Sequence, residues 1–201
     1  LEMASLGAKV LHSRCVEIAK KYGVELLVCS SLNRNSGTMV REKTKMEKML
    51  ISGVAADKNV AKIRVAGLGN DPESTFRLLN LLDRNNLNID VMIQSLGKDG
   101  TKSVSFTVAK PDMLRTIDVL NDNKDSLGIK KLDYDENVAK ISVIGAGVRS
   151  HSGVAAKMFG ALANAGINTE MITTSEIRIT ALIDEAYADQ AMRAIHETFL
   201  E

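Results

Sequence analysis

Two segments of this 201-residue chain are copies of one pattern. Residues 62–95 read KIRVAGLGNDPESTFRLLNLLDRNNLNIDVMIQS, and residues 140–175 read KISVIGAGVRSHSGVAAKMFGALANAGINTEMITTS. The copies begin 78 residues apart, at Lys62 and Lys140, whereas Asn88 and Asn168 are 80 residues apart. Two residues are therefore added in the loop between these points, while the pattern continues on both sides of it. Such a repeat predicts two units of one fold in tandem.

Each copy begins with a short strand, a glycine-rich loop and an amphipathic helix. Apolar residues alternate with polar ones at Ile63 and Val65 and again at Ile141 and Val143, as in a half-buried strand. The helix that follows has apolar residues at three- and four-residue spacing, which predicts one buried stripe. The stripe residues are Phe76, Leu79 and Leu82 in the first copy, and Val154, Met158, Leu162 and Ala165 in the second.

The first copy continues as a hairpin, a helix and a closing strand. A second strand is expected over residues 87–93, and Asp99-Gly100 between extended runs is typical of a tight turn. A third strand follows at Val104–Val108, then a helix and a last strand over residues 129–134. The order β-α-β-β-α-β is the split βαβ arrangement. The predicted fold class is therefore α+β, with two ferredoxin-like βαββαβ modules.

The second copy lacks a closing strand before the chain stops at Glu201. The apolar run Val24–Cys29 could supply it, which predicts that the first module is inserted into the second. The expected first module is residues 50–135, and the expected second module is residues 24–49 plus 136–201. A linking helix over about residues 8–22, within residues 1–23, would precede both and end at Gly23.

Charge and composition exclude several classes of function. The chain has 26 Lys plus Arg against 25 Asp plus Glu, a balance that argues against a nucleic-acid or anionic-membrane surface. It has no apolar run of membrane-spanning length and no signal-peptide pattern at residues 1–5, so a cytoplasmic location is expected. Cys15 and Cys29 have no partner at metal-ligand spacing. They are expected to be reduced and buried, and no metal site is expected.

Three segments of the chain carry distinctive motifs: residues 2–14 (EMASLGAKVLHSR), 145–155 (GAGVRSHSGVA) and 174–177 (TSEI). They resemble segments of the aspartate kinase family. The first is similar to the junction between kinase domain and regulatory region in that family, and the others are similar to its paired ACT domains, which are βαββαβ modules. Three positions depart from the family: Ser13 and Ser152 stand where Pro is common, and Glu73 stands where Gly is common. Glu73 places a carboxylate in the first module's loop.

The resemblance implies feedback control by lysine, threonine or both. The parent enzyme would phosphorylate the β-carboxylate of aspartate with ATP and Mg²⁺. The chain carries no P-loop, kinase lysine motif or metal-carboxylate cluster, so this part alone should not be a kinase and should need no cofactor. The implied partners are the catalytic domain or subunit and a second copy of the chain. In the family the effector lies where the first module of one chain meets the second module of another.

A free amino acid needs donors for its carboxylate and acceptors for its ammonium group. Glycine-rich loops that lead into helix N-termini suit the carboxylate through backbone N–H groups and a partial positive charge, which points to Asn70, Pro72 and Thr75 and to Val148 through Val154. The adjacent second strands offer acceptors, which include Asp90 and Gln94 in the first copy. Position by position, the resemblance implicates Asn70, Thr75, Gln94, Asn168, Thr169, Ser175 and Glu176. The candidate effector-binding set is Asn70, Thr75, Gln94, Val148, His151, Asn168, Thr169, Glu170, Ser175 and Glu176.

Other readings compete with an effector site. Gly145-x-Gly147-x-x-Ser150, with Glu170 further on, has the spacing of a dinucleotide fingerprint. The expected loop over residues 149–152 argues against it, because a Rossmann helix begins inside the fingerprint. A tight turn after the second strand, where a crossover is required, argues against it as well. Two alternatives stay open: a freestanding amino-acid sensor for another protein, and a purely structural dimerisation module. In the latter case Asn168, Ser175 and Glu176 would be ordinary cap and turn residues.

Overall fold

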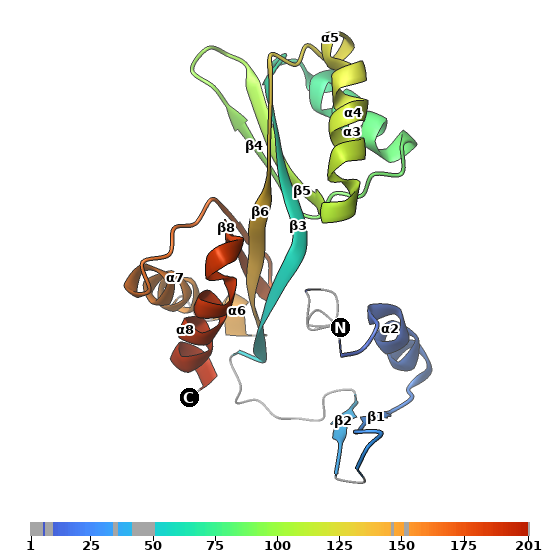
Figure 1. Cartoon of the computed structure of the whole chain (residues 1–201), viewed down its shortest axis with the longest axis vertical. Coiled ribbons are helices and arrows are strands. Elements are labelled where there is room, and N and C mark those ends of the chain that lie inside the picture. Colours follow the sequence, from blue (N-terminus) through green and yellow to red (C-terminus); the bar gives the residue numbers. More distant parts are fainter. Residues whose placement is uncertain are drawn as a thin grey trace.

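A six-stranded antiparallel sheet forms the centre of the molecule (Figure 1), in the strand order β4-β5-β3-β6-β8-β7. The computed structural model describes residues 6, 10–33, 36–41, 51–145, 147–150 and 153–200. The strands are β1 (Leu26–Val28), β2 (Thr38–Val40), β3 (Gly53–Leu68), β4 (Met92–Leu96), β5 (Lys102–Ala109), β6 (Lys131–Ile144), β7 (Met171–Thr174) and β8 (Arg178–Asp184). The helices are α2 (Ser13–Tyr22), α3 (Pro72–Arg84), α4 (Met113–Asp122), α5 (Lys124–Leu127), α6 (Gly147–Ser150), α7 (Val154–Asn164) and α8 (Ala188–Leu200), with 3-10 turns η1 (Lys110–Asp112) and η2 (Glu185–Tyr187).

The two longest strands, β3 and β6, belong to both halves of the sheet. They pair antiparallel along their length, and Val60 lies opposite Val138 near the middle. Beyond this point β3 pairs with β5 at one end, and β6 pairs with β8 at the other. Helices α3 and α4 lie against the first half and α7 and α8 against the second (Figure 1). The predicted α+β class with ferredoxin-like sheets is confirmed.

Each half has its own apolar core beneath its helices. In the first half Ile63, Phe106 and Leu78 belong to one buried cluster, and in the second Ile141 and Met158 belong to another. Each fully buried side chain of this size stabilises the fold by about 1.5–3 kcal/mol. Two separate cores agree with the reading of the repeat as two units of one fold.

The helix stripe expected in the second copy is present, but the one in the first copy is partly wrong. Helix α3 buries Ser74, Leu78 and Leu82, while Phe76 is 65% exposed. Apolar residues occupy several adjacent positions of this helix, so spacing alone allowed two stripes that differ by a fraction of a turn. In α7 the expected Val154, Met158 and Leu162 are buried.

The prediction that Val24–Cys29 supplies the last strand of the second module is wrong. Residues 26–28 form β1, which pairs with β2 in a separate two-stranded sheet. The strand beside β6 in the second half is instead the first part of β3, with Gly53 opposite Ile144 and Asp57 opposite Lys140. This part of β3 is rich in Ala and Gly, which are weak strand formers, and it merges with the repeat's own strand. The boundaries between modules stay a prediction, and residues 42–50 lie outside the described ranges.

The expected linking helix is present and ends where expected, but residues 10–12 are not part of it, and residues 8 and 9 lie outside the described ranges. Helix α2 starts at Ser13, after the N-cap His12, and Gly23 closes it with a φ of 65°. The expectation of buried cysteines is wrong, because Cys15 in α2 and Cys29 after β1 are both exposed. Within the described ranges, no helix is both long enough and apolar enough to cross a lipid bilayer.

Candidate functional site

The start of α3 is closed by its own N-cap residue. The Asp71 carboxylate accepts the backbone N–H groups of Glu73 at 2.9 Å and Ser74 at 2.8 Å, and also the Ser74 hydroxyl. The Ser74 side-chain hydrogen bond is the largest cause that lowers the pKa of Asp71. These two N–H groups therefore already have a partner and are not open to a ligand carboxylate.

A polar surface lies beside this helix start. The Thr75 hydroxyl donates to the Gln94 side-chain oxygen at 2.6 Å, which joins α3 to β4. The Lys102 ammonium group donates to the backbone carbonyl of Asp71 at 2.7 Å, which brings β5 to the same loop. Asn70 is exposed in this loop. The structure thus brings Thr75 and Gln94 together and adds Lys102, a cation that the sequence analysis did not single out and that could face a ligand carboxylate.

The corresponding loop of the second copy contacts the β7–β8 turn. The Gly145 N–H donates to the Ile177 carbonyl at 2.9 Å, and the Val148 N–H donates to the Gly145 carbonyl at 3.2 Å. The turn is closed by a hydrogen bond from the Ser175 N–H to the Arg178 carbonyl at 2.7 Å. These bonds place Val148 in the same loop region as the turn that carries Ser175 and Glu176.

One turn of helix, α6, forms at Gly147–Ser150. Residues 149 and 150 are therefore helical where a loop over 149–152 was expected, and residues 151 and 152 lie outside the described ranges. The candidate His151 lies outside the described residues. Ser175 and Glu176 are both exposed. This end of the second half therefore presents polar side chains to solvent beside the strand-to-helix loop, as in the first copy.

Three other candidates of the second copy lie at the opposite end of β7. Asn168, Thr169 and Glu170 precede this strand, whereas Ser175 follows it. At about 3.3 Å per residue, the five steps from Glu170 to Ser175 span about 16 Å. One chain therefore does not bring the two groups into a single site. The Glu170 carboxylate pairs with the ammonium group of Lys62, a partner that sequence reasoning missed.

The described residues include no group of three or more His, Cys, Asp or Glu side chains placed to hold a metal ion. The polar groups gathered at the two loops are hydroxyls, amides, carboxylates and an ammonium group. Their chemistry suits hydrogen bonding to a small charged molecule.

A model of the ACT domain family matches residues 141–199. The aspartokinase of Pseudomonas aeruginosa is 40% identical over 202 residues, which cover 99% of this chain and 49% of that protein. The chain thus spans about half the length of the curated relatives it matches. The resemblance to the aspartate kinase family is therefore confirmed over nearly the whole length of this chain.

Solved structures agree with this result. The ligand-free regulatory subunit of aspartate kinase from Thermus thermophilus is 33% identical, with a TM-score of 0.70 over 75% of this chain and 99% of that one. Escherichia coli aspartokinase III in complex with lysine and aspartate, in its T-state, is 25% identical, with a TM-score of 0.77 over 100% of this chain and 44% of that one. The chain therefore belongs to the aspartokinase family and corresponds to its ACT-domain regulatory region.

Proposed function

We propose that this chain senses an amino acid, lysine or threonine or both, and transmits its presence to the catalytic part of an aspartate kinase. The effector would bind at the strand-to-helix loops and lower the phosphorylation of aspartate by ATP, as feedback control of aspartate-family amino-acid biosynthesis. ATP and Mg²⁺ would serve the catalytic part. A cytoplasmic location follows from the same proposal, because that reaction uses cytoplasmic metabolites.

The hydrogen bond between Thr75 and Gln94 is the main support for this proposal. It holds two polar side chains from different elements in one place, and the Lys102 ammonium group lies at the start of the same helix, on the Asp71 carbonyl. A hydroxyl, an amide and a cation together can satisfy a zwitterion's carboxylate and ammonium groups. The lysine complex of the Escherichia coli relative adds support for lysine as the effector class.

The separation of the second-copy candidates favours self-association. Glu170 is about 16 Å from Ser175 along β7, and Asn168 and Thr169 precede Glu170, so one chain does not gather them with Ser175 around one ligand. A second copy of the chain could bring residues of its first module against either group. The proposed effector site is therefore completed in a dimer that forms through the ACT sheets.

The test is a calorimetric titration of the chain with L-lysine, L-threonine and, as a control, L-valine, which shares the zwitterion but lacks a polar side chain. We expect lysine or threonine to bind at millimolar concentration or below, and valine to bind more weakly. Sedimentation in the presence and absence of ligand then tests the dimer. No heat from either lysine or threonine at millimolar concentration would contradict the proposal and favour the structural dimerisation module.

A freestanding sensor for another protein is the second candidate. The two differ in partner, not in ligand, so the titration does not separate them. Adding the chain to the catalytic portion of an aspartate kinase separates the two candidates. Inhibition by lysine or threonine that requires the chain supports the regulatory role. Kinase activity that is the same with and without the chain contradicts it.

A further inference from the structure

Two ion pairs lie near the centre of the sheet, and each joins a residue of one sequence copy to a residue of the other. Lys62 and Lys140 occupy the same position in the two copies, and so do Asp90 and Glu170. The Lys62 ammonium group pairs with Glu170, and the Lys140 ammonium group pairs with Asp90. Each lysine thus binds the carboxylate that belongs to the other copy, in a reciprocal arrangement around the paired Val60 and Val138.

These pairs are partly withdrawn from water. The Lys140 side chain is only 8% exposed, and it has a second carboxylate, that of Asp57, at 3.3 Å. The Lys62 side chain is 24% exposed and that of Glu170 is 33% exposed. Charges in such places require partners, because desolvation without one is costly. The ion pairs therefore hold the Asp90 and Glu170 carboxylates next to Lys140 and Lys62.

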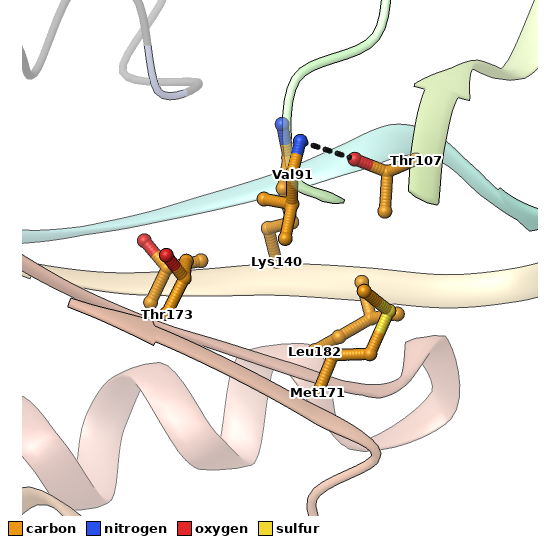
Figure 2. A pocket seen from close by; sticks show the side chains of 7 residues that line it. Val91, Thr107, Lys140, Met171, Thr173 and Leu182 are labelled. Atoms are coloured by element: carbon orange, nitrogen blue, oxygen red, sulfur yellow. Dashed lines mark hydrogen bonds between the residues drawn. The ribbon is translucent and has the colours of Figure 1, made fainter. Parts of the chain in front are cut away.

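An apolar cluster fills the space between the two pairs. It contains Val60, Val91, Val138, Met171 and Leu182, so side chains of both copies contact one another there. Val91 of the first copy lines one shallow pocket together with Lys140, Met171 and Leu182 of the second (Figure 2). The Val91 N–H donates to the Thr107 hydroxyl at 3.1 Å, which fixes the segment that carries Asp90.

Each paired acid lies at the beginning of a strand that leads to a proposed effector residue. Asp90 is followed by β4, which carries Gln94, and Glu170 is followed by β7, which leads to Ser175. Both strands are at the edges of the sheet, with a single strand neighbour each. An edge strand is hydrogen-bonded to a neighbouring strand on one side only. An ion pair at its start therefore adds to the backbone bonds that hold Asp90 and Glu170.

We infer that Lys62 and Lys140 are positioning residues: each fixes the effector-bearing edge strand of the other copy. Binding at one loop then alters the other through Lys62–Glu170 and Lys140–Asp90, so the two sites of one chain are coupled. The coupling rests on the proposed effector function, but the anchoring of β4 and β7 does not. Neither lysine contacts the ligand.

The test uses the less buried pair. Lys62→Glu and Glu170→Lys each place like charges together, and the double variant Lys62→Glu/Glu170→Lys restores an opposite-charge pair. The matched control is Lys58 with Asp189, an exposed pair at 2.9 Å that is attached to α8 and to neither effector strand. Lys58→Glu, Asp189→Lys and their double variant form the same series.

Hydrogen exchange by mass spectrometry is the first measurement, and it needs no ligand. In Lys62→Glu we expect the segment 167–174 to exchange at least about fivefold faster than in the parent, and 92–96 to change less. The double variant should return 167–174 to near the parent rate, and the control series should leave it unchanged. Unchanged exchange in Lys62→Glu would overturn the inference. So would a double variant no better than the singles or one that fails to fold.

Affinity for lysine and threonine is the second measurement. Lys62→Glu should weaken binding at least about fivefold, the lower end of typical allosteric coupling, and Lys58→Glu should not. Equal affinity in the parent and in Lys62→Glu would overturn the coupling. If the parent chain binds neither amino acid, the proposed function fails instead, and the exchange measurement alone decides whether Lys62 anchors β7.

Discussion

The Thr75 hydroxyl lies 2.6 Å from the Gln94 side-chain oxygen and joins the first turn of α3 to the middle of β4. A hydrogen bond near the surface adds only about 0.5–1.5 kcal/mol to stability. Its position therefore matters more for recognition than for folding. A ligand that enters this loop meets two side chains already held in one orientation, which lowers the entropy lost on binding.

Removing either partner should weaken effector binding without unfolding the chain. We expect Thr75→Val and Gln94→Leu each to reduce affinity about tenfold, because one lost hydrogen bond of about 1.4 kcal/mol corresponds to that factor. The double variant should be little worse than the singles, since both remove one interaction. Calorimetry measures this, and Thr198→Val in α8, whose hydroxyl donates to the Ala194 carbonyl, is the matched control. Equal loss in the control would assign the effect to general destabilisation.

Lys140→Met should destabilise the fold by about 3 kcal/mol. It leaves the Asp57 and Asp90 carboxylates without their shared cation, and the lower end of the range for broken buried pairs applies because Asp90 is 43% exposed. Lys58→Met, which removes an exposed pair, should change the free energy of unfolding by less than about 1 kcal/mol. Urea unfolding compares the two variants, and similar values for both would contradict the role assigned to Lys140.

The cap at Asp71 should make stability depend on pH in the acid range. Its pKa in the folded chain is lowered from 3.8, chiefly by the Ser74 hydroxyl, so its stabilisation is complete above 3.8 and is lost as the pH falls through the lowered value. Asp71→Ala should therefore be less stable than the parent at neutral pH, and the difference should shrink in this acid window. Asp112, which precedes α4 without a side-chain cap hydrogen bond, provides the control Asp112→Ala. A difference between parent and Asp71→Ala that stays constant across the window would refute the assignment.

Gly67 is required by the backbone at the end of the first repeated strand. Its φ is +87°, and an added Cβ would lie 2.5 Å from the Cβ of Lys130. Gly67→Ala should destabilise the fold by about 1–3 kcal/mol. Gly160→Ala, inside α7 with open space around it, should instead stabilise it by about 0.5–1 kcal/mol. Thermal unfolding would show the opposite signs, and a neutral Gly67→Ala would disprove this backbone requirement.

The repeat was sufficient to predict most elements, because local periodicity and turn residues determine where strands and helices begin. The origin of the last strand was not predictable in this way. Val24–Cys29 and Gly53–Asp57 are both short runs that can be strands, and only pairing with a distant segment decides between them. The first has an apolar composition, yet Leu27 is 60% exposed, while the second is Ala-rich and lies beside β6.

The candidate site was predictable to the level of loops but not of contacts. Thr75 and Gln94 were singled out from their positions in the repeat, and the structure brings them together. The lysines were visible as repeated residues, but nothing local indicates that each binds the other copy's acid. That exchange depends on how the edge strands β4 and β7 meet across the sheet, which is a property of the whole fold.

Amino-acid binding at the two loops can be mapped by NMR, from backbone amide shifts while L-lysine or L-threonine is added. We expect the largest shifts in the two loop regions, at residues 69–75 with Gln94 and at the 174–178 turn, and we expect them to follow one saturating curve per site. Smaller shifts should reach Glu170 and Asp90 through the ion pairs. Saturating shifts confined to other parts of the chain, or none with either amino acid at millimolar concentration, would contradict binding at the two loops.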